Sequence, residues 1–335
     1  MATHPSSVGL LLLGAILIAS LPAWAGMEAV AQTPQQPPAN SMPPVPPSGI
    51  RVVLLGTGGG PPVQLNRYEA STLVEAGGEL LLFDCGRGAT LRLAEYGIPL
   101  DQVSKVFLTH LHSDHVVDLP DLYLTPWSAA TARQAPFQVW GPPGTRSMMA
   151  YLQKAFAFDI HVRRDVDEKF SKEGISVVSH DIREGVVFDE NGVKVTAFLV
   201  DHGPVKPAFG YRIDYAGHSV VLSGDTRPSE NLIKFSQGVD VLIHEVRNAN
   251  ARRAEATHHT PEQVERIIAH HSTPEQAGTV FSRVNPRLAV YTHTDGSPDL
   301  IPETRPTYTG PLEIGEDLMT IDIADSVTVH RFAKK

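Results

Sequence analysis

The stretch Thr109-His110-Leu111-His112-Ser113-Asp114-His115 follows an apolar strand predicted for Lys105–Thr109. Three imidazoles and one carboxylate lie within six residues, and these are the ligands that zinc and similar borderline metals prefer. Residues two apart in an extended chain point the same way, so His110 and His112 can hold one ion. The turn that follows can direct Asp114 and His115 to a second ion. We therefore predict a metal site here, against the alternative of a histidine-rich surface turn.

Three further candidate ligands occur just beyond predicted strands: His202 in V-D-H-G-P, Asp225 in S-G-D-T and His293 in Y-T-H. Each is weak evidence alone, because a single histidine after a strand is usually a loop residue. Together they matter, because the active sites of α/β proteins gather at one strand edge. A carboxylate such as Asp225 can also bridge two cations about 3.5–4 Å apart. The sequence thus predicts a two-ion centre.

Short β-rich runs alternate with helical stretches from Ile50 onward. The predicted strands are Arg51–Leu55, Ser71–Glu75, Leu80–Asp84, Lys105–Thr109, Phe137–Trp140, Lys194–Val200, Phe209–Asp214, Ser219–Leu222, Val239–His244, Leu288–Thr292, Met319–Ile323 and Ser326–Arg331. The predicted helices are Ala89–Tyr96, Leu119–Ala132, Thr145–Phe156, Pro261–Ala269 and Pro274–Ser282. Thr260 and Thr273 are the predicted N-caps of the last two. This alternation predicts one α/β domain, residues 49–335, with two mixed sheets and outer helices.

The composition limits the function classes. The 335 residues include 28 Lys and Arg against 37 Asp and Glu, a net charge of −9, and one cysteine. Ordinary hydrophobicity excludes a disordered chain, and one cysteine excludes an internal disulfide. The negative charge argues against a protein whose main work is to hold a long nucleic-acid backbone. We therefore expect nucleic acid to be an unlikely partner.

The first 48 residues are predicted to contain a targeting signal followed by a flexible linker. Val8–Leu21 is an uncharged apolar run of signal-peptide length, followed by two A-x-A sites, so we predict a signal peptide over residues 1–31, cleaved after Ala25 or Ala31. It lacks a basic n-region, and a buried helix or a retained anchor are the alternatives. Residues 32–48 are rich in Pro and Gln and predict an extended, disordered tether. The mature protein is expected in the periplasm or outside the cell, with no membrane span.

Seven short motifs carry a resemblance that covers Ile50 to about Phe332. They are Gly56-Thr57-Gly58-Gly59-Gly60, Phe83-Asp84-Cys85-Gly86, the T-H-L-H-S-D-H run, Phe209-Gly210-Tyr211-Arg212-Ile213, Ser223-Gly224-Asp225-Thr226, His244-Glu245 and His271-Ser272-Thr273. In these motifs the chain resembles the metallo-β-lactamase-fold hydrolases, in the branch of tRNase Z-like phosphodiesterases and zinc-dependent arylsulfatases. The resemblance implies an αββα sandwich of two mixed β-sheets with outer helices.

The resemblance also implies roles for single residues. Two zinc ions are expected, the first held by His110, His112 and His202, the second by Asp114, His115 and His293, with Asp225 between them. Glu245 would orient His271, which protonates the leaving group; His259 is the alternative acid. Asp114, Glu245 and His271 are then the residues expected in catalysis. His258 and His270 are interpreted as surface histidines, and the cluster of Arg247, Arg252 and Arg253 as a solvated helix face rather than a phosphate contact.

The expected function is an exported binuclear zinc hydrolase that cleaves a small anionic ester, a phosphodiester or an aryl sulfate, by attack of a metal-bridging hydroxide. A tRNase Z-type 3′-tRNA processing activity is an alternative. It is set lower because no tRNA-binding arm fits between Asp214 and Ser219, Arg87 replaces a usual Glu, and the chain is acidic and exported. A β-lactamase or other ester or thioester hydrolase, and a non-catalytic metal-binding envelope protein, also stay open. The partner is expected to be the small ester, and a homodimer is left open.

Overall fold

The computed structural model describes residues 45, 48–129, 132–248 and 259–332, all within the compact unit Pro37–Lys335. The predicted signal peptide and nearly all of the predicted tether lie outside the described residues, as do His258, Arg252 and Arg253. Those assignments stay predictions. Among the described residues, no helix combines the length and the apolar character needed to cross a membrane.

The first sheet has eight strands in the order β15-β14-β1-β2-β3-β4-β5-β6. Pairing is antiparallel from β15 to β3 and parallel from β3 to β6, which makes the sheet mixed. The strands are β1 (Ile50–Gly56), β2 (Ser71–Ala76), β3 (Glu79–Phe83), β4 (Lys105–Phe107), β5 (Phe137–Gly141), β6 (Val177–Asp181), β14 (Met319–Ile323) and β15 (Val327–His330).

The second sheet has seven strands in the order β13-β12-β11-β10-β9-β8-β7 and is also mixed. Its strands are parallel from β13 to β10 and antiparallel from β10 to β7. They are β7 (Gly185–Glu190), β8 (Val193–His202), β9 (Val205–Tyr215), β10 (His218–Leu222), β11 (Val241–Glu245), β12 (Leu288–Thr292) and β13 (Leu312–Ile314).

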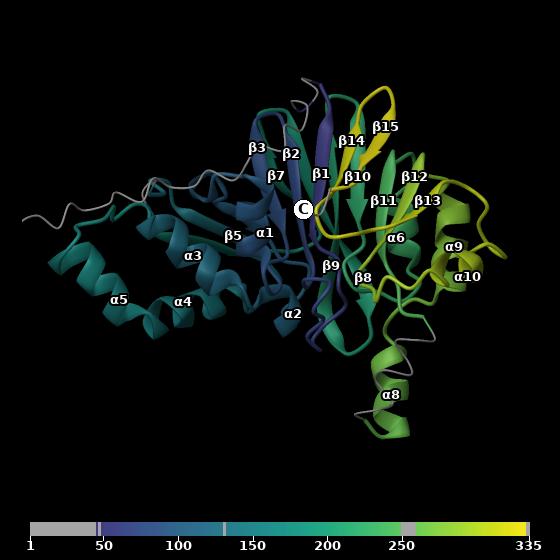
Figure 1. Ribbon diagram of the computed structural model, residues 1–335, viewed down its shortest axis with the longest axis horizontal. Coiled ribbons are helices and arrows are strands. Elements are labelled where there is room, and N and C mark those ends of the chain that lie inside the picture. The colour runs from purple at the N-terminus through teal and green to yellow at the C-terminus, as the bar shows by residue number, and fades with distance from the viewer. Residues whose placement is uncertain (1–44, 46–47, 130–131, 249–258, 333–335) are drawn as a thin grey trace, which may run out of the picture. The chain divides into compact units, whose positions relative to one another are not determined.

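Helices cover the outer face of each sheet, with α1, α3 and α4 on the first and α6, α9 and α10 on the second (Figure 1). The helical segments are α1 (Ala89–Tyr96), η1 (Leu100–Gln102), α2 (Ser113–Val116), α3 (Leu119–Ser128), α4 (Thr145–Ala155), α5 (Ala157–His161), η2 (Val162–Val166), α6 (Glu230–Phe235), α8 (Pro261–Ile268), α9 (Pro274–Val284) and α10 (Leu300–Thr304). The predicted αββα sandwich of two mixed sheets is confirmed.

Three apolar layers hold the sandwich together, and β1 shows how the sequence builds them. Val52 and Leu54 belong to the layer between the two sheets, whereas Val53 and Leu55 belong to the layer beneath the helices of the first sheet. Side chains on a strand alternate between its two faces, so a strand in the centre of a covered sheet is apolar at every position. This is why β1 reads as a continuous apolar run and was predicted from it.

Side-chain hydrogen bonds determine where the helices α8 and α9 begin. The side chain of Thr260 accepts a hydrogen bond from the backbone N–H of Gln263, and Thr273 accepts one from Gln276 in the same way. Each glutamine side chain returns the bond to the cap residue, which completes a capping box. The two predicted N-caps are therefore confirmed.

Some strands and most short helices have no counterpart in the sequence prediction; among the helical segments these are η1, α5, η2, α6 and α10. The strands β6, β7 and β13 were not predicted; β6 and β7 lie at sheet edges and carry exposed polar positions that blur the apolar pattern. Asp114 and His115 were expected on a turn, but they lie on the short helix α2. The helix still directs both side chains inward, because both are buried.

Candidate metal centre

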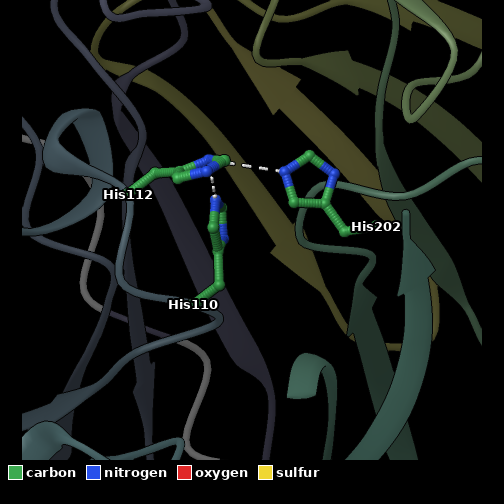
Figure 2. Close-up of side chains that lie close together, drawn as sticks. All are labelled: His110, His112 and His202. Atoms are coloured by element: carbon green, nitrogen blue, oxygen red, sulfur yellow. Dashed lines mark hydrogen bonds between the residues drawn. The ribbon is translucent and has the colours of Figure 1, made fainter. Parts of the chain in front are cut away.

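The seven predicted ligands meet at one edge of the sandwich, where β4, β8, β10 and β12 end. His110 and His112 follow β4, and His202 is the last residue of β8. The three imidazole rings point toward one another (Figure 2). The Nε2 atom of His110 lies 3.0 Å from Nδ1 of His112, and Nε2 of His202 lies 3.4 Å from the same Nδ1. Oδ2 of Asp225, which follows β10, is 4.0 Å from His110 Nε2 and 3.9 Å from His202 Nε2. Four candidate ligand atoms thus surround one point.

A second cluster shares Asp225 with the first. His293, directly after β12, places Nε2 3.2 Å from Oδ2 of Asp114 and 3.4 Å from Oδ2 of Asp225. The Nε2 atom of His115 lies 3.7 Å from Asp114 Oδ2 and 3.5 Å from Asp225 Oδ1. The carboxylate of Asp225 therefore faces both groups of ligands, in the position of a bridge.

The geometry of the cluster fits metal ions. Ligands about 2.0–2.1 Å from a tetrahedral zinc ion stand roughly 3.4 Å from one another, which is close to the separations in both clusters. The buried Nε2 atom of His115 has no hydrogen-bond partner among the described residues, although it faces two carboxylates. A buried polar atom without a partner is costly, and an ion between it and the carboxylates would remove that cost. Imidazoles together with carboxylates form a donor set that zinc accepts.

Residues behind the ligands decide which nitrogen of each histidine can bind an ion. His115 Nδ1 lies 2.7 Å from Oδ2 of Asp84, and His110 Nδ1 lies 3.0 Å from Oγ1 of Thr109, whose hydroxyl donates to Asp84. His202 Nδ1 lies 3.0 Å from the carbonyl oxygen of His270. In each case the outer nitrogen can donate its proton to this partner, so that Nε2 is the nitrogen left for an ion.

Sequence reasoning missed this supporting layer. Asp84 belongs to the Phe83-Asp84-Cys85-Gly86 motif, for which the sequence indicates no role, and Thr109 ends the strand predicted for Lys105–Thr109. The available signal was the position of Asp84 directly after the apolar strand β3, where a charged side chain needs buried partners.

Burial and charge act together on the protonation of the cluster. Burial lowers the pKa of His110 well below its ordinary value, which keeps the imidazole neutral, as a metal ligand must be. Burial acts to raise the pKa of Asp225, but the imidazoles of His293 and His115 outweigh it and hold that pKa well below its ordinary value. Asp225 is therefore an anion in the folded protein.

Glu245 and His271 form a buried pair beside the cluster. Oε1 of Glu245 accepts hydrogen bonds from the backbone N–H groups of Thr226 and Ser272, and it lies 3.3 Å from Nδ1 of His271. That nitrogen is also 3.9 Å from Oδ2 of Asp225. Burial raises the pKa of Glu245 and lowers the pKa of His271, so the folded protein favours the uncharged pair. The structure thus brings Glu245 and His271 into contact, and the role of the pair stays a prediction.

A cavity of about 350 Å³ opens beside the cluster. It is lined by Gly60, Pro61, Pro62, His112, Ser113, Asp114, Asp225, Arg247, His259, Ile267, His270, His271 and His293. Gly60 lies against Asp114 so closely that a Cβ atom on it would be 2.2 Å from Asp114 Cβ, which explains a glycine at this turn. The predicted acid His271 and its alternative His259 both reach the cavity, but His259 is exposed, whereas His271 is buried.

Two residues that the sequence analysis places at the surface line this cavity. His270 is half-buried; its ring packs 4.6 Å from that of His202 and lines the cavity wall, so it contributes to the site rather than to the outer surface alone. Arg247 is not on a solvated helix face; it follows β11 and is only 8% exposed. Neither position could be read from local pattern, because each depends on chain segments that come from elsewhere in the sequence.

Known proteins resemble this chain over most of its length. A model of the beta-lactamase superfamily domain matches residues 80–294. Over 289 residues the chain is 36% identical to a protein named ribonuclease Z from Mycobacterium sp. (strain KMS), a match that covers 84% of this chain and 98% of the relative. It is 33% identical over 287 residues to a ribonuclease Z from Mycobacterium bovis (strain BCG / Pasteur 1173P2), with 82% and 98% covered.

Solved structures show the same fold. The short form of human tRNase Z matches with a TM-score of 0.61 and 24% identity, covering 82% of this chain and 99% of that one. A metallo-β-lactamase fold protein from Bacillus subtilis matches with a TM-score of 0.62 and 20% identity over the same shares. Zinc-bound PqqB from Methylobacterium extorquens matches with a TM-score of 0.59 and 18% identity, covering 81% and 99%.

These findings correct two predictions. The preference for a small phosphodiester or aryl sulfate over a tRNase Z-type substrate is wrong, because the curated relatives are named ribonuclease Z and match over nearly their full length. The expectation that nucleic acid is an unlikely partner is wrong for the same reason. The short β9–β10 connection is real, since only Ala216 and Gly217 separate the strands, but it did not justify the conclusion. The net charge of the chain does not exclude a nucleic-acid substrate, because it sums all residues and does not describe the charge at one cavity.

Proposed function

We propose that this chain, which belongs to the beta-lactamase superfamily, is a ribonuclease of the ribonuclease Z type that hydrolyses a phosphodiester bond at the 3′ side of precursor tRNA. Membership in the superfamily makes it a metal-dependent hydrolase. The RNA substrate and the identity and number of the metal ions are the proposed part. The substrate is taken from the names of the relatives, and the chemistry is argued from the residues at the site.

One observation carries the chemistry: two groups of ligands share Asp225 and lie next to the Glu245–His271 pair. Hydrolysis of a phosphodiester needs a nucleophile, compensation of negative charge at the phosphoryl oxygens and a proton for the leaving oxygen. The carboxylate of Asp225 can bind two neighbouring cations, and the buried imidazole of His271 can supply the proton. The leaving group in this reaction is a ribose oxygen, a poor leaving group that benefits from protonation.

We assign two zinc ions to the centre. His110, His112 and His202 would hold one, Asp114, His115 and His293 the other, and Asp225 both. When bound, such ions lower the pKa of water towards neutrality and offset charge on the phosphoryl oxygens. Zinc is assigned rather than magnesium because five of the seven ligands are imidazoles, whereas magnesium prefers oxygen ligands.

The chain's own residues position the substrate and the proton. The cavity beside the cluster accepts the part of the RNA that extends from the scissile phosphate. Glu245 holds Nδ1 of His271, so the ring is fixed within reach of that cavity. An anionic phosphate next to the ring favours the imidazolium form, which can then give its proton to the leaving oxygen.

The test is cleavage of a precursor tRNA with a 3′ trailer by the purified full chain, with metal content measured in the same samples. The wild-type protein should carry about two zinc ions and release the trailer, and a chelator should stop cleavage until zinc is added back. Asp225→Ala should lower kcat by roughly a thousandfold or more, because the shared ligand is lost. Asp189→Ala removes a carboxylate from an exposed position on β7 and serves as the control with unchanged activity. Zinc-loaded wild-type protein that leaves the trailer intact would overturn the proposal.

A further inference from the structure

The β1–β2 loop, residues 57–70, forms one wall of the cavity beside the metal cluster. It begins with a glycine turn, and Gly60, Pro61 and Pro62 line the cavity. Residues 61–63, 65 and 66 are exposed, so the middle of the loop buries little surface of its own. A segment with few buried contacts keeps one position only if its ends are held.

The carboxylate of Asp317 holds both ends of this loop. Its Oδ1 accepts hydrogen bonds from the backbone N–H and the hydroxyl of Thr57, at 3.0 and 2.8 Å. Its Oδ2 accepts a hydrogen bond from the backbone N–H of Tyr68, 2.7 Å away, and one from Arg92 on α1, 3.1 Å away. Asp317 lies in the turn before β14, and its side chain is only 4% exposed. Bonds to a buried carboxylate are stronger than neutral ones, so this anchor is firm.

Arg67 joins the two ends of the loop to each other. Its Nη1 donates to the hydroxyl oxygen of Thr57, 2.6 Å away, and to the carbonyl oxygen of Gly315, 2.7 Å away. The hydroxyl of Thr57 therefore accepts from Arg67 while it donates to Asp317. Both ends of the loop are thus tied to the segment between β13 and β14.

The anchored end of the loop packs on two proposed ligands of the second ion. The carbonyl oxygen of Thr57 accepts a hydrogen bond from the backbone N–H of Thr294, 2.9 Å away and directly after His293. A Cβ atom on Gly59 would lie 3.0 Å from the carbonyl oxygen of His293, and one on Gly60 would lie 2.2 Å from Cβ of Asp114. The glycine turn therefore contacts both Asp114 and His293, which are 179 positions apart in the chain.

His293 needs such support because of its backbone. Its φ is 48°, in the left-handed region that residues other than glycine seldom adopt. A conformation of this kind persists where neighbouring structure fixes it. The bond between Thr294 and Thr57 fixes the residue that follows His293, and the imidazole then points its Nε2 to Asp114 and Asp225, 3.2 and 3.4 Å away.

We infer that Asp317 is a positioning residue for the second metal ion, because it anchors the loop that holds Asp114 and His293 together. Its loss should weaken the second ion selectively, since the first ion's histidines come from the ends of β4 and β8. The inference rests on the two-ion centre of the proposed function and adds the residue that keeps its second ion bound. It does not depend on the RNA substrate.

Zinc titration of the metal-free full chain measures the two affinities apart from turnover. The groups that bond the carboxylate of Asp317 are all donors, so the amide of Asp317→Asn must face one end of the loop with another donor. We expect the second zinc ion to bind about 10- to 100-fold more weakly and the first to stay within about threefold of wild type. Thr57→Val removes the hydroxyl alone and should weaken the second ion by a smaller factor.

Asp114→Ala shows which of the two ions is affected, because it removes a ligand of the second ion only. Adding Asp317→Asn to this variant should leave the affinity of the remaining zinc ion within about threefold. A general loosening of the fold would instead weaken that ion as well.

Asp240→Asn is the matched control. The carboxylate of Asp240 also accepts a backbone N–H, that of Ser219 at 2.9 Å, and an arginine, Arg287 at 2.8 Å. It precedes β11, at the end of that strand away from Glu245 and the metal cluster. The variant loses comparable hydrogen bonds and should bind both zinc ions with wild-type affinity.

Equal weakening of both ions by Asp317→Asn would overturn the inference, and so would zinc affinities equal to those of Asp240→Asn. A wild-type protein that binds fewer than two zinc ions would overturn the inference together with the proposed centre. Failure of the proposed substrate alone looks different: the second zinc ion would depend on Asp317, and the loaded wild-type protein would leave precursor tRNA uncut.

Discussion

Oδ2 of Asp84 lies 2.7 Å from Nδ1 of His115, and this contact determines which nitrogen of His115 carries the proton. With Nδ1 donating to the carboxylate, Nε2 is the nitrogen that would bind an ion beside Asp114 and Asp225. Asp84 reaches this position from the end of β3 with a φ of 57°, a left-handed conformation that Asp and Asn adopt more readily than most residues. One carboxylate thus connects the sheet to the candidate metal centre.

Asp84→Asn should weaken metal binding roughly 10- to 100-fold while the fold is kept. Asparagine suits the same backbone conformation and can still accept the bond from the Thr109 N–H. Its amide, however, would face the N–H of His115 with another donor, which favours the tautomer protonated on Nε2. Zinc titration of the metal-free protein measures the effect. Asp189→Asn, at an exposed position, is the control, and an Asp84→Asn variant with wild-type zinc affinity would remove Asp84 from the centre.

His271→Ala should lower kcat roughly 10²- to 10⁴-fold with little change in KM, since it removes the proposed proton donor. His259→Ala should stay within a few-fold of wild type, because His259 is exposed whereas His271 is buried 3.3 Å from Glu245. Steady-state cleavage of precursor tRNA by both variants, with zinc content measured in parallel, separates the two residues. A larger loss in His259→Ala would reverse the assignment, and a lost zinc ion in His271→Ala would make His271 a ligand instead.

Because His244 is buried, we expect the protein to lose stability in mild acid. Burial lowers the pKa of His244 to about 4, whereas in the unfolded chain it is expected near the ordinary value of about 6.5. Below that ordinary value the unfolded state binds the proton more strongly, so the free energy of unfolding falls as the pH drops from 6.5 towards 4. The contribution of His244 to this fall should reach about 2 kcal/mol at pH 5 and vanish above pH 7.

Urea unfolding of the chelator-treated protein at about pH 7.5 and pH 5 measures this contribution. His244→Asn should show a smaller difference between the two conditions than the wild-type protein, by about 2 kcal/mol, even though the substitution itself destabilises. His180→Asn removes an exposed histidine of β6 and should keep the wild-type difference. A His244→Asn variant with that full difference would contradict the prediction.

The sequence predicted what depends on local pattern. Continuous apolar runs such as Ile50–Leu55 mark strands buried on both faces, and the threonine caps mark the starts of α8 and α9. The run from His110 to His115 and the separate residues His202, Asp225 and His293 could be found because each follows a strand. Their meeting at one edge was a consequence of the α/β fold class, and the structure brings all seven together.

The prediction of a small ester substrate is wrong because it depends on the net charge of the whole chain and on the short connection between β9 and β10. A net charge of −9 counts every exposed Asp and Glu, yet the cavity contains one buried arginine beside two carboxylates. A substrate interacts with the charges that line the cavity. Burial lowers the effective dielectric constant there and so strengthens the interactions of each charge.

The sequence by itself therefore determined the fold class, the strands other than β6, β7 and β13, and the identity of the candidate ligands, because periodicity and ligand chemistry act over a few residues. Only the tertiary structure decided that Asp84 supports His115, that His270 supports His202, and that Arg247 lines the cavity rather than the solvent. The partner of Arg247, Gly60, lies 187 positions away in the chain. No local pattern encodes such a contact, because it exists only after two sheets have packed and their strand ends have met.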